Sequence, residues 1–323
     1  MTFIDFLQYN AVAFYGVVGF IALMVGSFLN VVIHRLPIMM EREWRAGLAE
    51  LDAETITDQQ DVSVSSLSTA TAAGPTTSII DTSISGELSS TGDTEEAFNL
   101  AVPRSRCPTC GTEIKAWQNI PLISYLFLGG KCGNCKSSIS IRYPLVEFFT
   151  MLLSLIVAWH FGPTPQAILG ILVTWFLVAM SMIDFDTQLL PDSLTLPLMW
   201  IGLLAALFPI FIDLRSAVIG AACGYMILWT IYQLFKLITG KEGMGYGDFK
   251  LLAALGALLG WQALPSIILL SSLVGAVVGL SLIAITGRDK NIPIPFGPYL
   301  AAAGWIAMLW GDTLTNWYYG ILS

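Results

Sequence analysis

Two aspartates stand at the edges of apolar stretches, where a carboxylate is unfavourable and usually functional. Asp248 ends the sequence K-E-G-M-G-Y-G-D, and an apolar helical pattern follows it over residues 249–259. The alternating glycines before it allow another chain to approach the backbone closely. Asp248 alone has a simpler interpretation as the N-cap of the next helix. The presence of Asp184 at the end of a separate apolar run favours a chemical role.

Two carboxylates held close together cannot both ionise easily, so they share a proton. One can then act as a base on water while the other polarises a carbonyl group, as in aspartic proteases. A membrane transporter that uses its aspartates for proton or cation coupling is the alternative. Transporters place such acids near the midplane and often contain repeats, whereas these acids lie at one edge and no repeat is evident. Asp186 and Asp192 lie close by, and these arguments do not decide between Asp184 and Asp186.

Four cysteines form two C-x2-C pairs about twenty residues apart. Each pair offers two thiolates from one tight turn, and the spacing is typical of a tetrahedral zinc site. Two disulfides or a redox pair are the alternatives, and the choice depends on the cellular compartment. The four cysteines are Cys107, Cys110, Cys132 and Cys135.

The composition is that of a membrane protein. Of the 323 residues, 55% are hydrophobic and 12% are charged, against about 25% charged in soluble domains. The net charge of −8 arises from residues 46–103, which contain ten acidic residues and no Lys or Arg. No basic patch interleaved with aromatic residues is present, so a nucleic-acid partner is not indicated. Because the first apolar run lacks a preceding basic segment, we expect it to remain as a membrane anchor.

Apolar runs along the chain predict an all-α polytopic membrane protein with about eight transmembrane helices. Residues 1–33 contain the first helix, and residues 144–323 are expected to form a membrane peptidase domain. The long loop 34–143 between them holds an acidic insert, 46–103, expected to be disordered, and a small tetracysteine domain, 104–143. The predicted helices are 12–33, 144–161, 166–185, 194–212, 216–238, 248–259, 264–286 and 297–317.

The distribution of basic residues predicts the orientation. With eight crossings, all but one of the 15 Lys and Arg residues fall on one side, and Arg215 falls on the other. The positive-inside rule therefore places the cysteine loop in the cytoplasm and both termini outside. Asp184 and Asp248 then lie together at the cytoplasmic edge. A reducing cytoplasm favours zinc over disulfides at the cysteines.

Several sequences carry a resemblance that extends over nearly the whole chain outside the insert. With the four cysteines, they make the chain resemble the bacterial type IV prepilin peptidases, which belong to the G-x-G-D intramembrane aspartyl proteases. The acidic insert departs from the shorter loop of that family. The sequences are G-S-F-L-N-V-V-I-H-R-L-P (26–37), N-I-P-L-I-S-Y (119–125), R-Y-P-L-V-E (142–147), I-D-F-D-T-Q-L-L-P-D (183–192), G-M-G-Y-G-D-F-K (243–250) and P-F-G-P-Y-L (295–300).

The resemblance implies a bifunctional enzyme of the bacterial inner membrane with its active site at the cytoplasmic face. Such enzymes cleave the leader of type IV prepilins and type II secretion pseudopilins after Gly. They then methylate the new N-terminal residue, usually Phe, with S-adenosylmethionine. The family pattern puts the catalytic pair on Asp184 and Asp248. The implied partners are prepilins, pseudopilins and membrane lipid.

The sequence contains no soluble methyltransferase fold that would hold the methyl donor. The only sizeable soluble segment with fold potential is the tetracysteine domain, 104–143. Gly129 and Gly130 in that domain are candidates for supporting methyl transfer.

Overall fold

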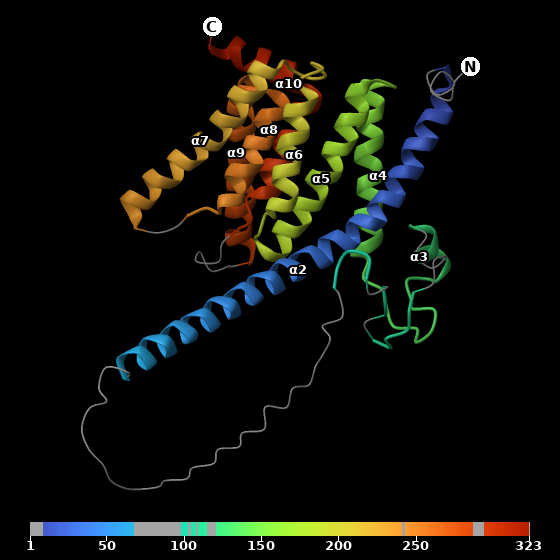
Figure 1. Ribbon diagram of the computed structural model, residues 1–323. Coiled ribbons are helices and arrows are strands. Elements are labelled where there is room, and N and C mark those ends of the chain that lie inside the picture. Colours follow the sequence, from blue (N-terminus) through green and yellow to red (C-terminus); the bar gives the residue numbers. More distant parts are fainter. Residues whose placement is uncertain are drawn as a thin grey trace, which may run out of the picture. The chain divides into compact units, whose positions relative to one another are not determined.

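The computed structural model describes residues 9–67, 98–102, 105–107, 109–114, 121–240, 243–286 and 294–322, with the backbone alone at 52–67, 123, 283, 312 and 314–322. The described chain is helical, with two isolated β-bridges and no strand (Figure 1). This confirms the prediction of an all-α protein. The elements are α2 (Ala11–Leu67), α3 (Ile123–Phe127), α4 (Arg142–Phe161), α5 (Pro165–Thr187), α6 (Asp192–Ala205), α7 (Leu214–Thr239), α8 (Tyr246–Leu259), the 3-10 turn η2 (Trp261–Ala263), α9 (Leu264–Thr286) and α10 (Gly297–Leu322).

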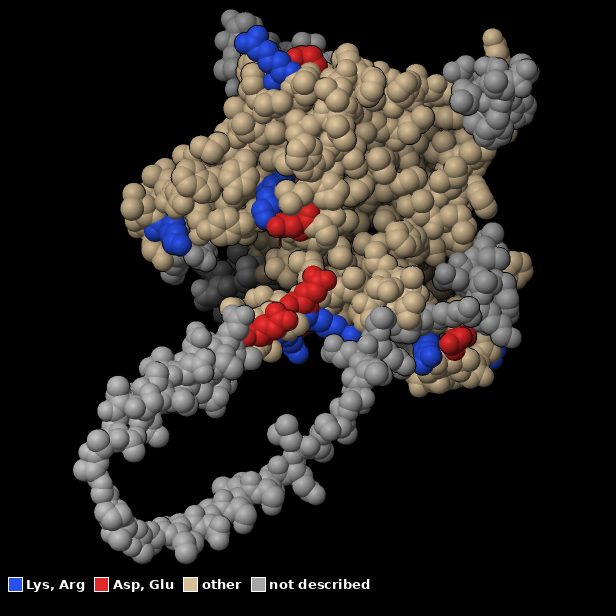
Figure 2. Space-filling view, in the orientation of Figure 1, with Lys and Arg blue, Asp and Glu red and all other residues tan. Residues whose placement is uncertain are grey.

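Apolar helices make this a multi-pass membrane protein. In the described part of the chain, five helices are long and apolar enough to cross a membrane. The face seen in Figure 2 is mostly uncharged, as expected for a surface in contact with lipid. α6 and α8 have 14 residues each and extend about 21 Å, against about 30 Å for the bilayer core. The number of eight crossings stays a prediction.

The first helix is longer than expected. α2 continues from Ala11 through Pro37 to Leu67, so the expectation of a disordered insert is wrong over residues 46–67. The first part of that stretch, 46–54, is rich in Ala, Leu and Glu, which have high helix propensity and outweigh the lack of apolar surface to bury. The remainder of the insert, 68–97, lies outside the described residues. Residues 38–104 form one compact unit, and residues 1–37 with 105–323 form another.

The helix that carries Asp248 lies in the protein core. α8 packs against α6, α7 and α10, and ten of its 14 residues are buried. Phe249, Leu251, Leu252 and Leu255 are among the largest fully buried side chains of the described chain. A helix that is apolar on all sides can be buried in this way. Asp248 is therefore held by protein on several sides.

Glycines let α7 and α8 approach until their backbones touch. A Cβ at Gly220 would meet the carbonyl oxygen of Gly256, and a Cβ at Gly256 would meet that of Gly220. One turn along, a Cβ at Gly224 would lie 2.6 Å from the carbonyl oxygen of Leu252. Small residues of this kind permit close helix packing in membranes, so the relative register of α7 and α8 is closely constrained.

Candidate active site and metal centre

Asp184 lies in the last turn of α5 and is only 5% exposed. The helix ends when Gln188 adopts a left-handed conformation and its N–H bonds the Asp184 carbonyl over 2.9 Å. The carboxylate accepts a 2.9 Å hydrogen bond at Oδ2 from the N–H of Gly297, the first residue of α10. The amino end of a helix stabilises negative charge. A second helix terminus thus holds this carboxylate in place.

Asp248 lies in the first turn of α8 and is 7% exposed. The N-cap of this helix is Gly245, and no side chain caps it. The interpretation of Asp248 as a capping residue is therefore wrong. Its Oδ1 is the one buried side-chain oxygen or nitrogen in the described residues that has no hydrogen-bond partner. A buried polar atom without a partner is unfavourable and needs a functional or solvent explanation.

Leu190 connects the two aspartates. A Cβ at Gly247, next to Asp248, would lie 2.5 Å from Leu190 Cβ. A Cβ at Gly297 would lie 3.2 Å from Leu190 Cδ1 and 2.6 Å from Asp184 Oδ2. The structure therefore brings Asp184 and Asp248 together from different helices.

The neighbouring aspartates have other partners. Asp186 forms a two-pronged ion pair with Arg142 at the start of α4, with Nη1 2.8 Å from Oδ1. Asp192 accepts hydrogen bonds of 2.6 and 2.7 Å from Lys250 Nζ, and the N-cap of α6 is Pro191. These pairs link the helices that carry Asp184 and Asp248 to their neighbours. Asp186 and Asp192 are thus exposed and paired with cations, whereas Asp184 and Asp248 are buried.

Glu147 is a second buried acid, 8% exposed, on α4. The structure gives it a specific contact. Its Oε2 accepts a 2.8 Å hydrogen bond from the N–H of Leu122, which precedes α3 and has a φ of 54°. A Cβ at Gly26 of α2 would lie 2.9 Å from the Glu147 Cα. Glu147 thus holds the loop before α3 against α2 and α4.

The four cysteines predicted to bind metal form one cluster. Their Sγ atoms all lie within 4.8 Å of one another, and those of Cys107 and Cys135 are 3.8 Å apart. A tetrahedral site with Zn–S bonds of about 2.3 Å places its sulfur atoms about 3.8 Å apart. All are free thiols. The cluster therefore fits a four-coordinate zinc ion.

The two C-x2-C turns have the same backbone plan. Cys107 N–H bonds Thr112 O over 3.0 Å, and Cys132 N–H bonds Ser137 O over 2.8 Å. Four residues after each of these cysteines, Gly111 and Lys136 adopt left-handed conformations and return their N–H to the cysteine carbonyl. Each turn thereby directs two thiols to the same side.

Hydrogen bonds also prepare a thiolate in this cluster. Bonds to the side chain and backbone of Thr112 lower the pKa of Cys110 to about 6. Asn134 supports the arrangement, since its Nδ2 donates to Thr112 Oγ1 over 2.9 Å and lies 3.8 Å from Cys110 Sγ. Because zinc binds the thiolate form, the surroundings of Cys110 favour its role as a metal ligand.

The two glycines predicted to support methyl transfer differ in their surroundings. Both have positive φ, 59° at Gly129 and 69° at Gly130. A Cβ at Gly130 would lie 2.9 Å from the Tyr125 hydroxyl oxygen, whereas a Cβ at Gly129 would meet no atom within 4 Å. Gly130 is therefore the position at which the backbone touches a side chain of α3.

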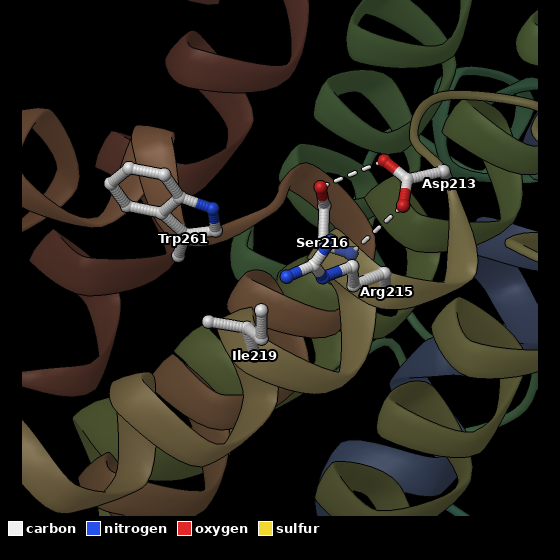
Figure 3. A pocket seen from close by; sticks show the side chains of 5 residues that line it. All are labelled: Asp213, Arg215, Ser216, Ile219 and Trp261. Atoms are coloured by element: carbon white, nitrogen blue, oxygen red, sulfur yellow. Dashed lines mark hydrogen bonds between the residues drawn. The ribbon is translucent and has the colours of Figure 1, made fainter.

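A cavity of about 590 Å³ lies at the far end of the α7–α8 pair from the aspartates. Figure 3 shows Asp213 directed at Ser216, whose hydroxyl and N–H bond its two oxygens over 2.7 and 3.1 Å. These bonds lower the pKa of Asp213, which is the N-cap of α7. A carboxylate used in this way has a structural role, and the cavity is separate from the aspartate pair. Its other lining residues are Arg215, Ile219 and Trp261.

Comparison with known proteins finds two family domains along the chain. Residues 20–161 match the bacterial peptidase A24 N-terminal domain, and residues 171–280 match the type IV leader peptidase family. A prepilin leader peptidase/N-methyltransferase of Pseudomonas aeruginosa is 51% identical over 319 residues, covering 98% of each chain. The chain belongs to the type IV prepilin peptidase family.

Other members of the prepilin peptidase family show the same extent of similarity. Proteins with that name from Stutzerimonas stutzeri and Legionella pneumophila are 53% and 45% identical, over 98% and 95% of this chain and 98% and 94% of their own. No solved structure matches the chain. The regions aligned with these relatives include the cysteine cluster and both aspartates.

Gly297 is the residue of this site that sequence reasoning missed. It lies in the P-F-G-P-Y-L motif of the family resemblance, and the available signal was a glycine between two prolines near an apolar helix. Gly297 is 113 residues from Asp184, so the spacing in the sequence does not indicate that the two residues are in contact.

Proposed function

We propose that this chain removes the leader peptide of type IV prepilins and type II secretion pseudopilins after Gly, and then methylates the new amino terminus. The proposal rests on the family and on the buried Asp184–Asp248 pair, in which Asp248 Oδ1 has no partner among the described residues. Such a pair can activate water and polarise a peptide carbonyl without a serine or cysteine nucleophile. Transport is disfavoured because the relatives are peptidases and both acids lie at one end of their helices.

The two aspartates have different surroundings and are assigned different roles. The Gly297 N–H favours negative charge on Asp184, so Asp184 is the base that takes a proton from the attacking water. Asp248 holds the shared proton at its unpartnered oxygen and donates a hydrogen bond to the carbonyl oxygen of the scissile peptide. The proton accepted by Asp184 then reaches the leaving amine.

The active site is assigned to the cytoplasmic face of the inner membrane. The support is the excess of Lys and Arg on the side that also carries the cysteine cluster. Lipid surrounds the exposed apolar helices, and no nucleic-acid partner is assigned. S-adenosylmethionine supplies an electrophilic methyl group for transfer to the new terminal amine.

The decisive experiment uses purified protein, a prepilin and S-adenosylmethionine. Mass spectrometry reports cleavage and methylation separately, because the cleaved pilin and its methylated form differ in mass. We expect a product cut after Gly and a methyl group on its new N-terminal residue. An intact prepilin in the presence of folded enzyme would contradict the assignment.

Metal analysis of the purified protein is expected to give about one zinc per chain, because four thiolates complete a structural site. Cys107→Ser or Cys132→Ser should remove most of the zinc. Cys223→Ser is the matched control, since Cys223 lies on α7 away from the cluster, and it should retain zinc. Zinc-free protein whose thiols are paired as disulfides in freshly isolated membranes would favour the redox alternative.

Substitution at Gly130 is expected to reduce methylation more than cleavage, because the aspartates lie on other elements. Gly130→Ser places a Cβ against Tyr125 and strains a positive φ. A sharper pair is Gly130→Asn and Gly129→Asn, since Asn tolerates positive φ and only position 130 adds the Tyr125 contact. The methylated fraction of cleaved pilin should fall at position 130 and stay near wild type at 129. Parallel loss of cleavage and methylation would assign the donor site elsewhere.

A further inference from the structure

The short helix α3 carries two neighbouring apolar side chains that protein does not cover. Leu126 is 77% exposed and Phe127 is 86% exposed. They lie between the two halves of the cysteine cluster in the sequence, outside the long apolar helices. Adjacent large apolar side chains with this exposure mark a contact surface in a folded protein.

A hydrogen bond sets the depth of α3. The N–H of Leu122, immediately before α3, donates to Glu147 over 2.8 Å. Glu147 is five residues along α4 from Arg142, at which that candidate span begins, and five residues of helix extend about 7.5 Å. In Figure 1, α3 lies level with the N-terminal end of α4. The start of α3 therefore lies at the same depth as the first turns of the transmembrane helix α4.

The surface of α4 at this depth is also apolar and exposed. Leu145, Phe148 and Phe149 are between 41% and 50% exposed on a helix that is long and apolar enough to span the bilayer. The lipid acyl chains that cover these side chains would also lie beside α3, at the same depth in the membrane. Lipid is thus the expected partner of the exposed side chains of α3, because it already covers the neighbouring surface of α4.

The backbone of α3 suits an apolar environment. The N–H groups of Leu126, Leu128 and Gly129 bond carbonyls of residues 122, 124 and 126 over 2.9–3.2 Å. Backbone groups at membrane depth must be paired within the protein. These bonds pair the backbone of the second half of the turn, where Leu126 and Phe127 lie, within the protein.

We propose that α3 is a shallow re-entrant anchor, with Leu126 and Phe127 inserted among acyl chains of the leaflet on the side of the tetracysteine domain. Glu147 fixes its depth by holding Leu122. The anchor holds the cysteine cluster at the membrane surface, with both C-x2-C turns beside α4.

Photo-crosslinking tests this assignment on the full chain. The benzophenone analogue of phenylalanine is placed at Phe127, and the protein is reconstituted in nanodiscs of phosphatidylethanolamine and phosphatidylglycerol. Phe149 on α4, 50% exposed, is the positive control, and the exposed Thr109 between Cys107 and Cys110 is the negative control. After irradiation, mass spectrometry should find lipid adducts at 127 and 149 and none at 109.

Two outcomes overturn the anchor. One is lipid adducts at 149 without any at 127. The other is adducts at 127 to an added prepilin or to a second copy of this chain in place of lipid, which would make α3 a protein-docking surface.

Glu147 variants test how the depth is set. With the probe at 127, Glu147→Gln keeps an oxygen that can accept from Leu122 N–H, so the lipid adduct should persist. Glu147→Ala removes that acceptor, and the adduct should be lost. A second probe at 149 reports membrane insertion of the variant. An undiminished adduct at 127 in Glu147→Ala would overturn the role of this hydrogen bond.

Discussion

Asp184→Asn and Asp248→Asn are each expected to lower leader cleavage by about 10²–10⁴-fold, the usual contribution of a general acid or base. Each substitution keeps the shape of the side chain, but the new amide can neither hold the shared proton nor act as the base. Both aspartates are buried, at 5% and 7% exposed, so a neutral amide should not weaken membrane insertion. The measurement is the rate of prepilin cleavage, with the amount of folded protein in the membrane determined in parallel.

Asp186→Asn is the matched control two residues from Asp184. Asp186 is partly exposed and pairs with Arg142, and such pairs contribute about 1 kcal/mol or less. Cleavage by this variant should stay close to wild type. Near-normal cleavage by either Asp184→Asn or Asp248→Asn would remove the pair from the mechanism.

Gly297→Ala is expected to reduce cleavage by about 10²-fold, the effect of misplacing a catalytic group by about 1 Å. The new Cβ would lie 2.6 Å from Asp184 Oδ2 and 3.1 Å from its Cγ, too close for either atom to stay in place. The N–H donor remains, so the variant tests the approach of the backbone. The readout is the cleavage rate constant at saturating prepilin.

Gly311→Ala, directly after the kink at Trp310 that divides α10, is the control, because a Cβ there meets no atom within 4 Å. It should cleave at the wild-type rate. Equal activity of Gly297→Ala and Gly311→Ala would show that the contact with Asp184 has no part in catalysis.

The helices were largely predictable because their signals are local. An apolar run fixes α5, for example, and Thr164 caps it by accepting from Ala167 N–H, with Pro165 as its first residue. α6 was predicted to reach residue 212 and ends at Ala205. Pro209 follows, and the backbone before a proline is restricted away from helix.

The surroundings of the aspartates were not predictable from local signals. Apolar residues on all sides of α8 suit either lipid or a protein core, and the structure gives it a core position. The Gly297–Asp184 contact joins residues far apart in sequence. The cysteine cluster was predictable because each C-x2-C turn carries its geometry in a few residues.

The backbone contact between Gly220 of α7 and Gly256 of α8 has a consequence for substrate entry. These helices touch without intervening side chains, so parting them would expose paired backbones to lipid and forfeit close packing. An opening for the prepilin between these two helices is therefore disfavoured. α5 and α10 pack against each other as well, with Trp305 Nε1 donating to Thr174 Oγ1 over 3.0 Å and the Gly297 N–H donating to Asp184. We therefore expect α7 and α8 to move as one rigid pair when a substrate reaches Asp248, carrying this aspartate with them.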